Sequence, residues 1–123
     1  MTLVLVVDDV PAMAEQYAYD LKRLGGYETL VAVGGEQALD LIAREAPGCV
    51  VLDLEMPGTD GFEVLRALER RGAEVPVIVY TGTGNYDRCI QAVRAGAAGF
   101  IDKSEPMERV VREIGRASCR ERV

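Results

Sequence analysis

Five short apolar runs, each followed by a segment whose apolar residues have helical spacing, constrain this chain more than any other feature. The runs occupy residues 3–7, 27–33, 49–52, 77–80 and 99–101. Short runs rich in Val, Ile and Leu are typical of strands buried on both faces, and intervening helices require parallel strands. Repeats of this unit favour the doubly wound strand order 2-1-3-4-5. The sequence therefore predicts an α/β fold with a five-stranded parallel sheet and helices on both faces, with residues 27–33 nearer an edge because they alternate only partly.

The segments between the runs carry apolar stripes that predict which helical faces are buried. The predicted inward residues are Ala14, Tyr17, Leu21 and Leu24, then Ala38, Leu41 and Ile42, then Phe62, Leu65 and Leu68, then Ile90 and Val93, and finally Met107, Val110, Val111 and Ile114. At 123 residues, this pattern fits one domain with a single sheet.

Composition excludes several classes of function. The net charge of −6 argues against nonspecific nucleic-acid binding, which depends mainly on Lys and Arg. The apolar start is stopped by Asp8, so it is neither a signal-peptide core nor a membrane span, and we expect a cytoplasmic protein. The chain has no histidine, which removes Ser-His-Asp and Cys-His arrangements and most transition-metal sites. Carboxylates remain as the reactive side chains that cluster in the sequence.

Acidic side chains directly follow two of the predicted strands. Asp8 and Asp9 end the first run, and Asp53 ends the third. In the order 2-1-3-4-5 these two strands flank the switch point, where the carboxyl ends of the strands form a crevice. Thr81 and Lys103 follow the fourth and fifth strands and reach the same rim. Taken alone, Asp53 could equally cap a turn.

Three neighbouring carboxylates repel one another and need a cation. Lys103 is one candidate and a divalent metal is another. Oxygen ligands from three acids without a full protein cage suit Mg²⁺, which keeps several waters and shares its coordination with a substrate phosphate. An aspartate can also act as a nucleophile and form an acyl phosphate. These residues therefore predict a site for a phosphoryl group.

Four motifs, in this order, resemble the receiver domain of bacterial two-component response regulators. They span residues 6–9, 53–61, 80–82 and 96–103, and the resemblance covers roughly residues 3–114. It implies that Asp53 accepts a phosphoryl group from a histidine kinase or a phosphotransfer protein. It also implies a signalling switch rather than an enzyme, one that catalyses only its own phosphorylation and dephosphorylation.

The same resemblance implies roles for individual residues. The implied Mg²⁺ ligands are Asp8, Asp9, Asp53 and the backbone carbonyl of Glu55. Thr81 would hydrogen-bond the phosphoryl oxygens, and Lys103 would pair with them. Phe100 matches an aromatic switch position whose ring turns inward when Thr81 moves. The fourth helix, fifth strand and fifth helix would then form the output face and a possible homodimer surface.

One position departs from the family pattern. Members usually have Pro, often with a cis bond, directly after the lysine that matches Lys103, whereas here Ser104 follows and Pro106 comes later. A cis bond before Ser would cost about 2.5–4 kcal/mol, so a trans bond is predicted. Glu55 and Thr83 match positions that tune the lifetime of the phosphoryl group.

Two other functions remain as alternatives. A degenerate receiver would act as a phosphorylation-independent interaction module, although its usual mark, a missing acid, Thr or Lys, is not found here. A Mg²⁺-dependent phosphohydrolase would usually place a second Asp two residues after its nucleophile, where this chain has Glu55. The stretch from Tyr80 to Glu113 resembles receivers attached to transcriptional activators of the ATP-driven class, and a stand-alone receiver acting on a protein partner is the other possibility.

The end of the chain is predicted to lie outside the receiver, which we assign to residues 1–112. Residues 117–123 lack apolar periodicity and a cap, and residues 113–123 resemble the translation of a sequencing-library adapter. We therefore expect the natural gene to continue beyond about residue 112, with room for a C-terminal output domain.

Overall fold

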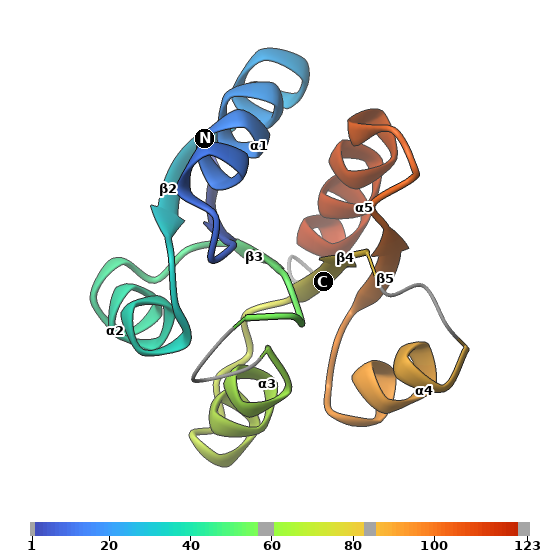
Figure 1. Ribbon diagram of the computed structural model, residues 1–123. Helices are drawn as coiled ribbons and strands as arrows, with labels where there is room; N and C mark the ends of the chain where they lie inside the picture. Colours follow the sequence, from blue (N-terminus) through green and yellow to red (C-terminus); the bar gives the residue numbers. More distant parts are fainter. Residues whose placement is uncertain (1, 57–60, 83–85, 121–123) are drawn as a thin grey trace.

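The computed structural model describes residues 2–56, 61–82 and 86–120, in which strands and helices alternate (Figure 1). The elements are β1 (Leu3–Val7), α1 (Pro11–Gly25), β2 (Glu28–Ala32), α2 (Gly35–Glu45), β3 (Cys49–Leu52), α3 (Gly61–Arg70), β4 (Val77–Thr81), α4 (Tyr86–Arg94), β5 (Gly99–Asp102) and α5 (Met107–Arg120). Each predicted strand and helix is present.

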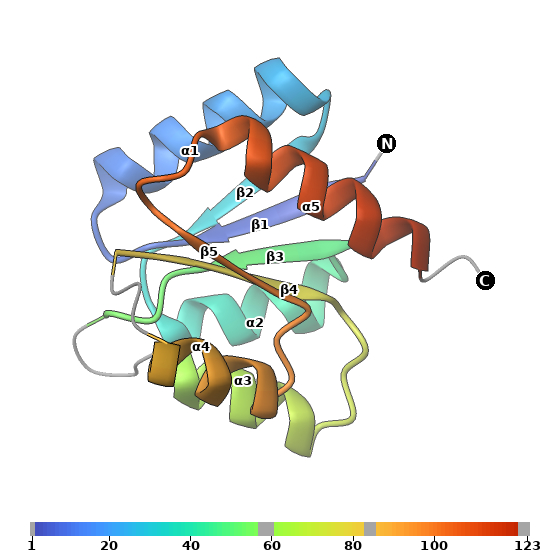
Figure 2. The same cartoon turned by 90° about the vertical axis from the view of Figure 1, so that its right-hand side faces the viewer.

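The strands form one parallel sheet in the order β2-β1-β3-β4-β5, as predicted. In register, Val7 of β1 lies opposite Ala32 of β2 on one side and Leu52 of β3 on the other. Helices α1 and α5 cover one face of the sheet, and α2, α3 and α4 cover the other (Figure 2). The carboxyl ends of β1 and β3 therefore lie side by side, at the point where the connections diverge to opposite faces.

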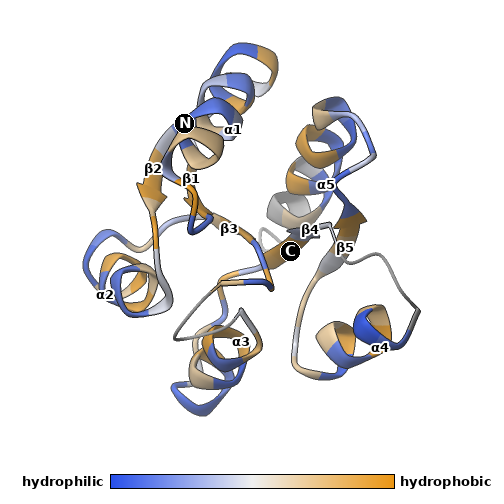
Figure 3. Cartoon of the chain, viewed as in Figure 1, coloured by the Kyte–Doolittle hydropathy of each residue, from blue (hydrophilic) through white to orange (hydrophobic). Residues whose placement is uncertain are grey.

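The core consists of two apolar layers, one on each face of the sheet. Successive strand residues point to opposite faces, so Val6 packs with α1 and α5 whereas Val7 packs with α2 and α3. Every residue of β3 is buried, as expected for a central strand with helices on both faces. Apolar residues concentrate on the strands and on the helical faces turned toward them (Figure 3).

The predicted inward stripe of α4 is wrong at one position. Val93 is 55% exposed, Ile90 is half-buried, and Ala92 is fully buried. Ala95, one turn beyond Ala92, also packs against the core. Because the small Ala92 is at the centre of the inward stripe, the helix can pack closely. The next residue is rotated by about 100° around the helix axis, so Val93 faces solvent.

Glycine at the start of α3 allows a close approach between that helix and the segment after β3. The Gly61 N–H donates to the Leu54 carbonyl at 3.1 Å, and a Cβ at Gly61 would lie 2.6 Å from the Asp53 carbonyl oxygen. We expect Gly61→Ala to lower the free energy of unfolding by about 1–3 kcal/mol, because backbone atoms cannot yield to the added methyl.

Denaturant unfolding measures this effect. Gly82→Ala is the matched control, since its methyl would meet nothing within 4 Å, and it should change stability by less than about 0.5 kcal/mol. Equal unfolding midpoints for the two variants would contradict the close approach.

Helix α5 continues past residue 112 and through Gly115, and Ala117 is buried against the sheet. The domain boundary after residue 112 stays a prediction, and residues 121–123 lie outside the described part. Within the described residues there is no cis peptide bond, so the Lys103–Ser104 bond is trans as predicted. None of the described helices is long and apolar enough to cross a membrane.

Candidate functional site

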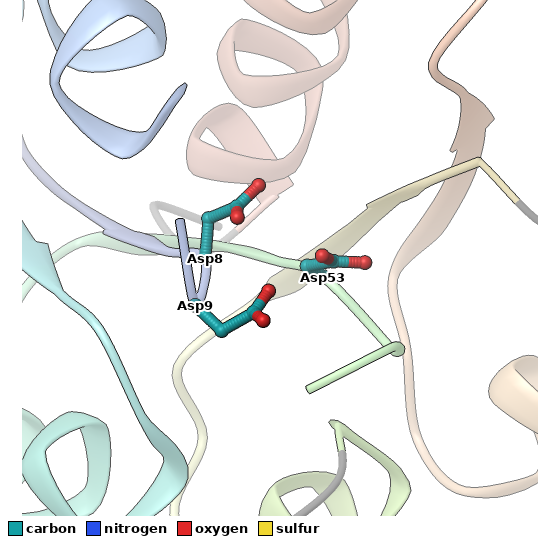
Figure 4. Close-up of side chains that lie close together, drawn as sticks. All are labelled: Asp8, Asp9 and Asp53. Carbon is teal, nitrogen blue, oxygen red and sulfur yellow. The ribbon is translucent and has the colours of Figure 1, made fainter. Parts of the chain in front are cut away.

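Three carboxylates meet where β1 and β3 end. Asp8 and Asp9 directly follow β1, and Asp53 directly follows β3, where its N–H donates to the Val7 carbonyl at 3.0 Å. One carboxylate oxygen from each aspartate lies within 4.8 Å of the others, and the three side chains lie close together (Figure 4). The structure thus brings together the three acids that the strand order predicted to be neighbours.

Asp53 is a buried carboxylate with several donors. It is only 6% exposed, and its Oδ1 accepts hydrogen bonds from the Thr81 hydroxyl at 3.0 Å and from the Glu55 N–H at 3.1 Å. Its Oδ2 lies 3.5 Å from Lys103 Nζ. Burial raises the pKa of Asp53, because the lowering effects of the Glu55 N–H, Lys103 and Thr81 do not offset the loss of solvent.

Lys103 bridges the two deeply buried acids. Its Nζ donates to Asp8 Oδ2 at 2.9 Å, and its backbone N–H donates to the Thr81 carbonyl at 3.0 Å, which fixes the chain after β5. The other oxygen of Asp8 accepts the Val10 N–H at 3.0 Å. Burial lowers the pKa of Lys103, but the hydrogen bond to Asp8 and the negative charges of Asp53 and Asp8 outweigh it, so the pKa is raised. Lys103 is therefore an ammonium at neutral pH.

The donor set fits a hard divalent cation. Among the described residues, the Lys103 ammonium is the cation within salt-bridge distance of Asp8 and Asp53. The three carboxylates therefore carry excess negative charge in a largely buried position. Asp9 is half-buried, so the cluster opens toward solvent on its side. Carboxylate oxygens with room for water are the ligands that Mg²⁺ prefers. The role of the Glu55 carbonyl stays a prediction, and Thr83 lies outside the described residues.

The family model for the response regulator receiver domain matches residues 4–115. The chain belongs to the response regulator receiver domain family. Receivers are modules of two-component signalling proteins rather than classical enzymes. Solved structures agree: the receiver domain of the Francisella response regulator 1452 matches with a TM-score of 0.92 at 25% identity, over 98% of this chain and 99% of that one. FixJ-N matches with a TM-score of 0.87 at 31% identity, over 96% and 94%.

Curated relatives of this receiver are longer response regulators. The chain is 35% identical to the C4-dicarboxylate transport transcriptional regulatory protein DctD of Pseudomonas aeruginosa, over 94% of this chain and 25% of the relative. It is 37% identical to the response regulator MprA of Mycolicibacterium vanbaalenii, over 88% of this chain and 46% of the relative. The receiver therefore spans about a quarter to a half of the length of these relatives.

Phe100, the predicted switch residue of the receiver, lies on β5. It is half-buried, pairs in register with Val79 of β4 and packs against the layer formed with α2 and α3. Thr81, at the end of β4, pairs with Asp102 of β5. Two neighbouring strands thus carry Thr81 and Phe100, and the coupling between them stays a prediction.

Sequence reasoning missed three contacts at the rim of the receiver site, made by Tyr17 and Arg88. The ring of Tyr17, predicted only as part of the inward stripe of a helix, has its centroid 5.5 Å from Lys103 Nζ. The Arg88 guanidinium lies 5.2 Å from the Phe62 ring centroid, and its Nη2 lies 3.9 Å from Glu55 Oε1. Each of these contacts joins segments that are far apart in the chain. No regular spacing of aromatic or basic residues in the sequence could therefore predict them.

Neutralising Asp53 should stabilise the metal-free receiver at neutral pH. Because burial raises its pKa above the ordinary value of about 3.8, the folded chain binds this proton more tightly than the unfolded chain. The contribution of Asp53 to stability therefore falls as the pH rises through the window between the two pKa values. We expect Asp53→Asn to raise the thermal unfolding midpoint at pH 7 in chelator, and this advantage to vanish below pH 3.8. A variant less stable than the parent at pH 7 would contradict the sign.

Proposed function

We propose that this receiver accepts a phosphoryl group on Asp53 from a histidine kinase or a phosphotransfer protein, with Mg²⁺, and then switches an output surface. The observation that carries the proposal is the setting of the Asp53 carboxylate. It is buried and accepts a hydrogen bond from the Thr81 hydroxyl. It also lies 3.5 Å from the Lys103 ammonium and close to two further carboxylates. A carboxylate kept among cationic and hydroxyl groups at a strand end suits covalent phosphoryl transfer.

The carboxylates of Asp8, Asp9 and Asp53, with the Glu55 carbonyl, would hold Mg²⁺. When bound, the metal neutralises charge on the phosphoryl oxygens and on the acids around them. Lys103 already neutralises part of the Asp8 charge at 2.9 Å. The cluster would then accept a phosphoryl group that its own negative charge would otherwise repel.

The transfer step needs a carboxylate oxygen of Asp53 as the nucleophile. That oxygen bonds to phosphorus in line with the donor, the phosphorus–nitrogen bond of the phosphohistidine breaks, and its electron pair stays on the imidazole nitrogen. The product is an acyl phosphate on Asp53. Lys103 Nζ starts within 3.5 Å of the carboxylate, so a small movement pairs it with a phosphoryl oxygen.

The switch begins at the Thr81 hydroxyl. It now donates to Asp53 Oδ1, and in the acyl phosphate it would donate to a phosphoryl oxygen instead. Such a shift at the end of β4 would open space for the Phe100 ring on β5. The face formed by α4, β5 and α5 would change shape and serve as the output or homodimer surface. Relatives such as DctD, named as a transcriptional regulatory protein, suggest control of transcription through a C-terminal output domain.

Intact-mass spectrometry after incubation with a small phosphodonor tests this function. We expect one added phosphoryl group on the parent with Mg²⁺ and none without it. Asp53→Asn should take up none, whereas Asp40→Asn, which changes an exposed aspartate on α2, should behave as the parent. An unmodified parent would favour a phosphorylation-independent interaction module. Steady turnover of a generic phosphomonoester without a stable adduct would favour a phosphohydrolase.

A further inference from the structure

Lys103 is held by hydrogen bonds at its backbone N–H and at the tip of its side chain. The Lys103 N–H donates to the Thr81 carbonyl, and the following turn is closed by Asp102, whose Oδ1 accepts the Ser104 N–H at 2.8 Å. Ser104 places no ring constraint on the backbone next to Lys103. Beyond Cα, the lysine has a flexible four-carbon stem. Its ammonium pairs with Asp8 Oδ2 at 2.9 Å and lies at a longer 3.5 Å from Asp53 Oδ2, so a further surface would help to hold it between the two acids.

The ring of Tyr17 provides this surface. Tyr17 lies on α1, and its ring centroid is 5.5 Å from Lys103 Nζ. This distance is within the range of a cation–π contact, which is stronger where solvent is partly excluded. Tyr17 is half-buried and Lys103 is about one quarter exposed, so both groups have lost much of their water.

Tyr80 fixes the ring of Tyr17 in turn. The two ring centroids are 5.2 Å apart with an interplanar angle of 76°, an edge-to-face arrangement. Tyr80 is buried, immediately precedes Thr81 in β4, and donates its hydroxyl to the Glu105 carbonyl at 3.4 Å. One side chain therefore contacts both the ring that faces Lys103 and the loop that carries Lys103.

We propose that Tyr17, supported by Tyr80, is a positioning residue that keeps the Lys103 ammonium between Asp8 and Asp53, ready to pair with an incoming phosphoryl group. The expected effect on the phosphorylation rate rests on the function proposed above. The effect on the position of the Lys103 side chain does not. The aromatic face of Tyr17 contacts the ammonium, so the phenolic hydroxyl is dispensable for this role. Without the ring, the ammonium samples positions away from Asp53 and transfer slows.

Three variants separate positioning from general packing. Tyr17→Leu removes the ring, Tyr17→Phe keeps it, and Tyr19→Leu makes the same change on the same helix at a side chain that is 61% exposed. With a small phosphodonor and saturating Mg²⁺, we expect Tyr17→Leu to be phosphorylated about tenfold more slowly than the parent. Tyr17→Phe and Tyr19→Leu should stay within about twofold. The Mg²⁺ affinity of all three should match the parent, because none removes a carboxylate.

A second readout does not depend on phosphorylation. The chain has only two lysines, and Lys22 is exposed on α1, so its signals are an internal reference for those of Lys103. In carbon–proton NMR spectra, ring-current shielding should place the ε-methylene protons of Lys103 upfield of those of Lys22. The shift should persist in Tyr17→Phe and collapse in Tyr17→Leu.

These outcomes decide the proposal separately from the function. If Tyr17→Leu is phosphorylated as fast as the parent, or Tyr17→Phe as slowly as Tyr17→Leu, the positioning role is wrong. If the parent takes up no phosphoryl group, the proposed function fails, and the lysine spectra alone decide the role of Tyr17. Coincident lysine signals in the parent would then overturn it.

Discussion

Replacing Asp9 by Asn should weaken Mg²⁺ binding by about 10- to 100-fold and slow phosphorylation to the same extent at limiting Mg²⁺. The variant removes one of three carboxylates whose oxygens lie within 4.8 Å of one another. Asp9 is the informative choice, because Asp8 also pairs with Lys103 and its loss would leave a partly buried ammonium short of a partner. Isothermal titration calorimetry measures the affinity directly.

The exposed Asp40 supplies the control for this prediction. Asp40→Asn makes the same chemical change on α2. In the described part of the structure, the salt bridge of Asp40 is with Arg44. It should leave the Mg²⁺ dissociation constant unchanged. Equal affinities for the parent and Asp9→Asn would show that Asp9 is not a ligand and would limit the metal site to Asp8 and Asp53.

Replacing Thr81 by Ala should separate phosphorylation from switching. The variant keeps the Asp53 carboxylate, the Glu55 N–H and Lys103, so we expect phosphorylation to continue within about tenfold of the parent rate. It loses the hydroxyl that contacts Asp53 at 3.0 Å, and with it the link that we propose to the Phe100 ring. NMR spectra of the phenylalanine rings should therefore show a phosphorylation-dependent change for Phe100 in the parent and none in Thr81→Ala.

Thr81→Ser is the matched control, because it keeps a hydroxyl at the same position. We expect it to restore most of the Phe100 response. The chain has two phenylalanines, so assignment needs only one further variant, and Phe62→Leu removes the other set of signals. A full Phe100 response in Thr81→Ala would rule out the hydroxyl as the link between Asp53 and β5.

The fold could be predicted from the sequence because its signals are local and agree with one another. Short apolar runs separated by helical stripes require parallel strands, and only a few connection orders remain. The stripe of α4 was wrong at Val93 because two small residues, Ala92 and Ala95, set its inward face. Hydrophobicity alone ranks Val above Ala, whereas close packing of a short helix favours the smaller side chain.

The sequence could predict only those site residues that lie at the ends of strands. Asp8, Asp53 and Thr81 come directly at or after strands, so the sheet order alone makes them neighbours. The contact between Tyr17 and Lys103 depends instead on the rotation of α1 over the sheet and on the path of the loop after β5. Neither has a periodic signature, and a tyrosine on a helical stripe reads as core.

Locating the modified residue tests the central claim most directly. An acyl phosphate is reduced by borohydride to the alcohol, which converts a phosphorylated aspartate into homoserine, and peptide sequencing by mass spectrometry then finds its position. After treatment of the parent with a small phosphodonor and Mg²⁺, we predict homoserine at position 53 and at no other acidic position. Conversion of Asp8 or Asp9 instead, or equal labelling of Asp53→Asn, would contradict the assignment of Asp53 as the phosphoacceptor.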